Sequence, residues 1–79
     1  MTIREFLKTR VPVGEIVVFR ENYWQIGMTR IDNDDLYLKS LSPKLLDEYE
    51  LDYSTHEKYE WATVDVLVVN AKHIDGGDL

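Results

Sequence analysis

The sequence of 79 residues contains no cysteine. Disulfide bonds and thiolate-ligated metal sites are therefore excluded, and a small hydrophobic core must hold without them. No run of apolar residues approaches the roughly 20 positions that a membrane-spanning helix needs. The first residues, MTIREFLKTR, carry charged side chains where a secretory signal peptide needs an apolar stretch. We therefore expect a soluble, intracellular protein.

Signatures of catalysis and of metal binding are also lacking. No G-x-S-x-G, Walker or G-x-G-x-x-G motif occurs. The two histidines, His56 and His73, lack the H-x-x-x-H and H-E-x-x-H spacings of zinc sites. The acidic run at 32–35 resembles the start of an EF-hand loop, but Tyr37 and Pro43 occupy the positions that need glycine and glutamate. We expect no catalytic activity, no cofactor and no metal site.

Charge is distributed unevenly along the chain, whose net charge is −6. Residues 1–30 hold five basic and three acidic side chains, for a net charge of +2, and residues 31–79 hold four lysines and twelve carboxylates, for −8. Such an asymmetry predicts an electrostatic partner. The acidic excess disfavours binding to nucleic-acid phosphates and to anionic membranes. We therefore expect a basic protein surface as the partner, with no direct contact to nucleic acid or membrane.

Two short helices are predicted from their capping residues. Thr2 and Glu5 form a T-x-x-E capping box, and a proline and a glycine within residues 11–14 end the first helix. The pair Ser42-Pro43 supplies an N-cap and a first-turn proline for a second helix over 44–48. Both helices are too short to persist alone, so each must dock on a sheet.

The remaining segments predict β strands. Residues 15–20 and 23–31 read as a hairpin, and residues 36–38 as a short third strand. Residues 49–55 alternate in polarity, and residues 61–71 contain a continuous apolar run that is typical of a central strand buried on both faces.

Within the predicted hairpin, alternation places Trp24, Ile26 and Met28 on one face. Gly27 marks either a bulge or a close approach of backbone.

These elements predict an α+β fold. We expect a mainly antiparallel sheet of four to five strands with two short helices, in a single domain over 1–79 whose tail from 73 to 79 is frayed. Helices on one face would leave the other face partly open.

A cluster of tyrosines and carboxylates in the acidic half is the candidate partner-binding site. Tyrosine supplies contact area, and carboxylates pair with arginine or lysine of a partner. Glu50 and Asp52 are two residues apart, so they share a strand face opposite Leu51, and a turn at 56–60 would bring further carboxylates nearby. A solubilising acidic rim is the alternative. The candidate residues are Glu48, Glu50, Asp52, Tyr53, Glu57, Tyr59 and Glu60.

The order TIREFL, a strand at 15–19, SPKLLDEYELDY and a final hydrophobic strand resembles short phage- and prophage-encoded proteins of Gram-positive bacteria. The resemblance covers most of the chain in layout and implies a location in the bacterial host cytoplasm. Some acidic proteins of mobile elements are anti-CRISPR proteins or other DNA mimics, which occupy the basic channel of a host enzyme. The resemblance thus implies a nucleic-acid-binding host protein as the partner, and it assigns no site residues.

A structural or assembly protein is the alternative function. An open sheet face carrying Trp24 and Ile26, or an unpaired strand edge, would then form a homo-oligomer.

Overall fold

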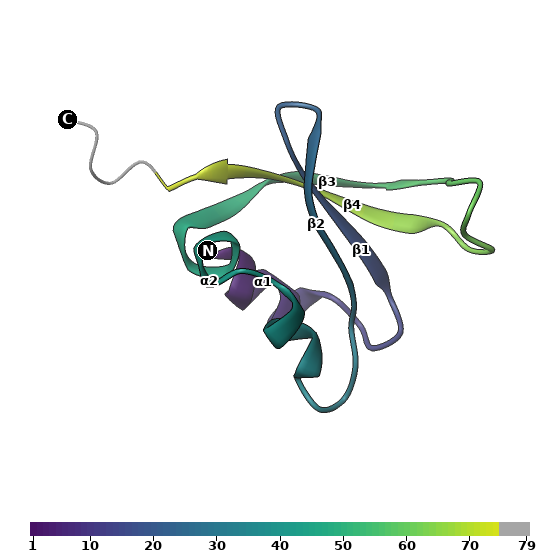
Figure 1. The fold of residues 1–79 in the computed structure, drawn as a ribbon, viewed down its shortest axis with the longest axis horizontal. Helices are drawn as coiled ribbons and strands as arrows, with labels where there is room; N and C mark the ends of the chain where they lie inside the picture. Colours follow the sequence, from purple (N-terminus) through teal and green to yellow (C-terminus); the bar gives the residue numbers. More distant parts are fainter. Residues whose placement is uncertain (75–79) are drawn as a thin grey trace.

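The protein forms one four-stranded sheet with its helices on one side (Figure 1). The computed structural model describes residues 1–74. The elements are α1 (Ile3–Arg10), β1 (Ile16–Glu21), β2 (Trp24–Arg30), the 3₁₀ helix η1 (Leu36–Ser40), α2 (Pro43–Glu48), β3 (Tyr49–Glu57) and β4 (Val66–His73). The predicted α+β class is confirmed, as are both capped helices.

The sheet is mixed rather than purely antiparallel. Its strand order is β2-β1-β4-β3. The pairs β1–β2 and β3–β4 are antiparallel hairpins, whereas β1 and β4 run parallel. Two parallel strands must be joined by a long crossover connection. Here the connection from the β1–β2 hairpin to β4 runs through η1, α2 and β3. The predicted central position of the last strand is confirmed, because β4 has neighbours on both sides.

The strand predicted at 36–38 is wrong, because these residues lie in η1. The turn before it is closed by a side chain: Asp32 Oδ1 accepts hydrogen bonds from the amides of Asp34 (2.9 Å) and Leu36 (3.1 Å). Asp35 then adopts a left-handed backbone with φ of 57°. Such local bonds from aspartate compete with extended structure, and they direct the chain into a helical turn that buries Tyr37.

The second hairpin also differs from its prediction. β3 continues to Glu57 and β4 begins only at Val66, so the connection spans residues 58–65. At the other end β4 includes His73, and the amide of Ile74 donates to the carbonyl of Glu48 at 2.9 Å. The predicted frayed tail therefore does not begin at residue 73, and the rest of that tail, 75–79, lies outside the described residues.

The main core lies between the helices and one face of the sheet. Alternate residues of the two inner strands, such as Phe19 and Val69, are fully buried there. The helices contribute three apolar side chains of α1 and two leucines of α2. The helical members are Ile3, Phe6, Leu7, Leu45 and Leu46.

The sequence predicted either a β-bulge or a close approach of backbone at Gly27, and the structure shows both. The register between β1 and β2 shifts between Phe19 and Arg20, so one extra residue of β2 is accommodated beside Gly27. A Cβ atom added at Gly27 would lie 3.1 Å from Cδ2 of Leu45. The absent side chain thus lets α2 pack against the hairpin.

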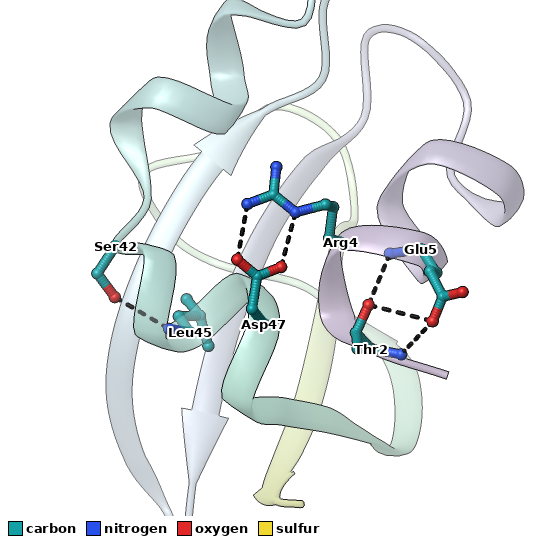
Figure 2. Close-up of polar contacts among 6 residues, drawn as sticks. All are labelled: Thr2, Arg4, Glu5, Ser42, Leu45 and Asp47. Carbon is teal, nitrogen blue, oxygen red and sulfur yellow. Dashed lines mark hydrogen bonds and ion pairs between the residues drawn. The ribbon is translucent and has the colours of Figure 1, made fainter.

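The two α-helices are joined by a bidentate ion pair (Figure 2). Arg4 on α1 donates from Nε to Asp47 Oδ1 at 2.7 Å and from Nη2 to Oδ2 at 2.9 Å. Figure 2 also shows the capping box of α1, in which Thr2 and Glu5 bond each other's backbone and side-chain groups. This bidentate pair links α1 to α2 through two charge-assisted hydrogen bonds.

Replacing Asp47 with asparagine tests this ion pair. The hydrogen bonds from Arg4 hold the pKa of Asp47 below the ordinary value of 3.8. A carboxyl group with a lowered pKa stabilises the fold above its unfolded pKa and loses that contribution as pH falls through its folded pKa. We therefore expect Asp47→Asn to lower Tm at neutral pH and to leave Tm unchanged well below pH 3.8.

The matched control is Glu48→Gln, since Glu48 is an exposed neighbour with no ion pair among residues 1–74. Its effect on Tm should be small and independent of pH. Thermal melts that show the same pH profile for both variants would contradict a stabilising role for the ion pair.

Candidate functional site

The predicted partner-binding residues fall into two groups at opposite ends of β3. This strand has nine residues, so its ends are separated by roughly 26 Å at the usual rise per residue. Glu48 to Tyr53 lie near the α2 end, whereas Glu57 to Glu60 lie at the distal end of the β3–β4 hairpin. Figure 1 shows β3 running from α2 out to this distal end. The set does not form a single surface.

The distal group is held by an arginine that the sequence reading had not singled out. Arg20 donates from Nη1 and Nη2 to the two carboxylate oxygens of Glu57, each at 3.3 Å. Its Nη2 also donates to the Tyr59 hydroxyl, and the guanidinium carbon lies 5.8 Å from the centroid of that ring. The ring of Trp61 packs at 5.1 Å from that of Tyr59. Glu57 and Tyr59 thus have partners within the fold, while Glu60 is exposed.

A second, smaller apolar cluster lies on the sheet face away from the helices. Val18, Val66 and Val68 are fully buried yet do not belong to the helix-side core. Arg20 shares the face of Val18, two residues before it, and Glu57 pairs with Val66 in register. We attribute the burial of the valines to the Arg20 stem and the aromatic rings of the 58–65 connection. The face predicted to be open is therefore covered at this position.

The proximal group lies where β3 is irregular. The β3–β4 register shifts between Leu51 and Tyr53, which leaves Asp52 without a partner on β4. The predicted sharing of one strand face by Glu50 and Asp52 rested on unbroken alternation, and this bulge interrupts it. Glu50 pairs in register with Lys72. Tyr53 pairs with Asn70, and its side chain is 55% exposed.

A notch of about 200 Å³ opens beside this bulge, between the β1–β2 turn and β3. Its origin is a difference in strand length: β1 pairs with β4 only as far as Arg20 and Asn70, whereas β4 continues beside β3 to His73. We refer to this depression as the notch. Its side chains include Glu21, Tyr23, Asp52, Tyr53, Asn70 and Lys72.

Of the residues that line the notch, the sequence predicted only Asp52 and Tyr53 as site residues, and Tyr23 is the aromatic residue among those it missed. Asn22 and Tyr23 form the β1–β2 turn with φ values of 50° and 73°, as a type I′ turn requires. Asparagine tolerates this backbone, whereas a bulky residue there is strained. The ring of Tyr23 is 95% exposed. Two β-like runs separated by a short polar turn signal such a hairpin, but nothing in the sequence places the turn next to β3.

Glu21 is fixed at the edge of the notch by a buried tyrosine. The hydroxyl of Tyr49 donates to Glu21 Oε1 at 3.0 Å. Burial raises the pKa of Tyr49, and the bond to Glu21 raises it further, so the phenol stays protonated and remains a donor. The other side of the Tyr49 ring packs against His73, with ring centroids 4.2 Å apart. The carboxylate of Glu21 therefore has a defined position.

The notch brings together two exposed tyrosines, the carboxylates of Glu21 and Asp52, and one lysine. This arrangement suits contact with a cationic group. Within residues 1–74, no three histidine, aspartate or glutamate side chains gather in a way that would hold a metal ion. None of the helices in that part of the chain is long and apolar enough to span a membrane.

No protein-family model, curated protein or solved structure matches this chain. The chemistry of its own surface therefore carries the functional argument.

Arg20→Ala tests the role of the distal network in the fold. The variant loses hydrogen bonds to Glu57 and Tyr59 and the stem over the valines, so we expect its free energy of unfolding to fall by about 2 kcal/mol. Arg20→Met, which keeps much of the stem, should lose less.

Glu60→Gln is the control, because this exposed carboxylate of the same hairpin should change stability by less than about 0.5 kcal/mol. Urea denaturation measures all three variants. An equal stability for Arg20→Ala and Glu60→Gln would show that the network contributes nothing to the fold.

Proposed function

We propose that this chain is a non-catalytic acidic binding protein that engages a basic protein surface through the notch. The observation that carries the proposal is the notch itself, which is lined by Tyr23 and Tyr53 together with the carboxylates of Asp52 and Glu21. An arginine or lysine of the partner, placed between the two rings, would gain cation–π contact and a charge-assisted hydrogen bond together.

The position of the tyrosines favours binding over a purely solubilising role. Tyrosine adds a large contact area for few rotatable bonds, and it is enriched at interfaces. Tyr23 is held on a two-residue turn, so its backbone loses little freedom on binding. A surface that served only solubility would need the carboxylates but not these rings.

Two further carboxylates lie on the same stretch of chain as Asp52. Glu48 is exposed at the end of α2, and Glu50 lies two residues before Asp52 on β3. Lys72 stands opposite Glu50 and offsets part of this charge. The remaining negative potential would raise the association rate with a cationic partner more than the final affinity.

A nucleic-acid-binding host protein is the partner class that we propose, because its channel is already lined with cationic groups. On this proposal the chain comes from a mobile element and acts as a DNA mimic or another inhibitor of host defence, as its resemblance to phage-encoded proteins implies. The acidic, tyrosine-bearing surface would occupy the channel in place of nucleic acid.

Charge removal at the notch gives the first test. The triple variant Glu48→Gln, Glu50→Gln, Asp52→Asn should retain Tm, because it leaves the Arg20–Glu57 pair intact. The control triple Asp34→Asn, Glu60→Gln, Asp65→Asn removes the same charge from exposed positions elsewhere. Wild-type and control protein should capture the same basic proteins from bacterial lysate, in amounts that fall as salt is added, whereas the notch triple should capture at least tenfold less.

Tyr23→Gly separates binding from folding. Glycine suits the second position of a type I′ turn, so this variant should be at least as stable as wild type. Its affinity for the captured partner, measured by calorimetry, should nevertheless fall because the ring is lost. Unchanged affinity of Tyr23→Gly and of the notch triple would refute the notch as the binding surface.

Homo-oligomerisation is a second candidate function, favoured by the exposed edge of the sheet. β2 has a neighbour on one side only, and its Trp24 and Met28 side chains are 77% and 49% exposed. An apolar edge strand offers unpaired backbone groups to another copy of the chain.

Light scattering after size exclusion at micromolar concentration tests this alternative. A dimer through β2 should dissociate in the variant Ile26→Lys, since a charge on an edge strand opposes pairing, while Glu60→Gln should leave it intact. A monomer at all concentrations would exclude assembly through this edge.

A further inference from the structure

A second cavity, of about 180 Å³, lies between the C-terminal end of α1 and the segment that joins β2 to η1. Figure 1 shows the chain turning there, below the helices. Backbone hydrogen bonds hold the two sides together: Gly14 donates to the carbonyl of Ile31 at 2.8 Å, and Ile31 donates to that of Glu15 at 3.0 Å. We refer to this cavity as the α1 pocket. It is distinct from the notch, which lies beyond the other end of β1.

Tyr37 lines the α1 pocket, and its hydroxyl has no hydrogen-bond partner among residues 1–74. Tyr37 is only 4% exposed, and its ring belongs to the main core. Every fully enclosed side-chain oxygen or nitrogen in that range does have a hydrogen-bond partner. The hydroxyl is therefore not fully enclosed, and Tyr37 is among the residues that line this pocket. A buried phenol that leaves its polar end free in a cavity is available to a ligand.

Two carboxylates accompany this hydroxyl. Asp32 and Asp35 line the pocket together with Tyr37. Burial raises the pKa of Tyr37, and the negative charges of Asp35 and Asp32 raise it further. Asp32 uses Oδ1 for the turn and keeps Oδ2 free, and the side chain of Asp35 makes no capping bond. The carbonyl end of α1 adds negative potential at the same place.

The other walls are apolar: Leu7, Val11, Val13 and Ile31. Lys8 is the one cationic group that lines the pocket. Within residues 1–74 it forms no ion pair with either carboxylate. The volume is below the roughly 300–1,000 Å³ of pockets for drug-sized ligands, and it suits a short chain.

We propose that the α1 pocket binds a primary ammonium group on a short aliphatic chain, carried by a free alkylamine or by a lysine side chain. The methylenes would lie against the apolar walls. The three N–H donors of the ammonium would meet the oxygens of Asp32, Asp35 and Tyr37. A guanidinium fits less well, since its fork is matched best by one carboxylate. This inference does not rest on the function proposed for the notch.

NMR titration of the full chain with n-butylamine, protonated at neutral pH, tests the proposal. We expect saturable shifts of the methyl signals of Val11, Val13 and Ile31 at millimolar concentrations, and none with n-butanol, which has the same chain without the charge. A second arm uses Nα-acetyl-lysine N-methylamide, with the norleucine analogue as its control. Binding of both amines identifies a lysine side chain as an acceptable source, and binding of butylamine alone identifies a free amine.

Two variants locate the binding. Asp35→Asn preserves a side chain that tolerates the left-handed backbone, and Tyr37→Phe removes a hydroxyl that has no partner in the fold, so both should keep Tm. Each should weaken butylamine binding at least fivefold. Asp34→Asn, in the same turn but outside the pocket, should bind as wild type does. Equal binding of n-butanol, or equal weakening by Asp34→Asn and Asp35→Asn, would overturn the proposal, as would the absence of saturation.

Discussion

The parallel pairing of β1 with β4 is the constraint on which the rest of the structure depends. It joins two hairpins that are each closed locally, through a register that runs from Val17 and Leu67 to Arg20 and Asn70. Two structural features of the β1–β2 side follow from it. Arg20 is brought within reach of Glu57, 37 residues further along the chain, and β4 continues past the end of β1, which opens the notch. A different register would change both.

The continuous apolar run of β4 reflects the two environments that this pairing creates. Leu67 and Val69 face the helices, whereas Val66 and Val68 face the Arg20 network. A domain of this size has few residues to spare for a second layer, and the outer valines are nevertheless fully buried without a helix on their face. The partly buried charge of Arg20 is tolerable because Glu57 and Tyr59 satisfy it.

Helices and strands that are decided by neighbouring residues were predicted well from the sequence. Features that depend on contacts between distant residues could not be predicted. The capping box at Thr2, the Ser42 N-cap and the apolar run of β4 are each decided by neighbouring residues, and each is confirmed. Residues 36–38 were predicted as a strand, but their helical conformation depends on a side-chain hydrogen bond accepted by Asp32. The predicted site residues fall into two separate groups because β3 is long and carries a bulge at Asp52. Both features follow from the pairing of β3 with β4, which has no signature in the sequence.

Tyr23 links the energetics of the fold to its surface. A non-glycine residue in a left-handed backbone costs roughly 1–2 kcal/mol, and Tyr23 has a φ of 73°. Its ring is 95% exposed, so burial within the fold offsets almost none of that cost. The turn holds the ring beside Asp52 and Tyr53, where contact with another molecule would remove its apolar area from water. Strain in an exposed aromatic residue is therefore consistent with a binding role for the notch, and a glycine at the same position would serve the fold alone better.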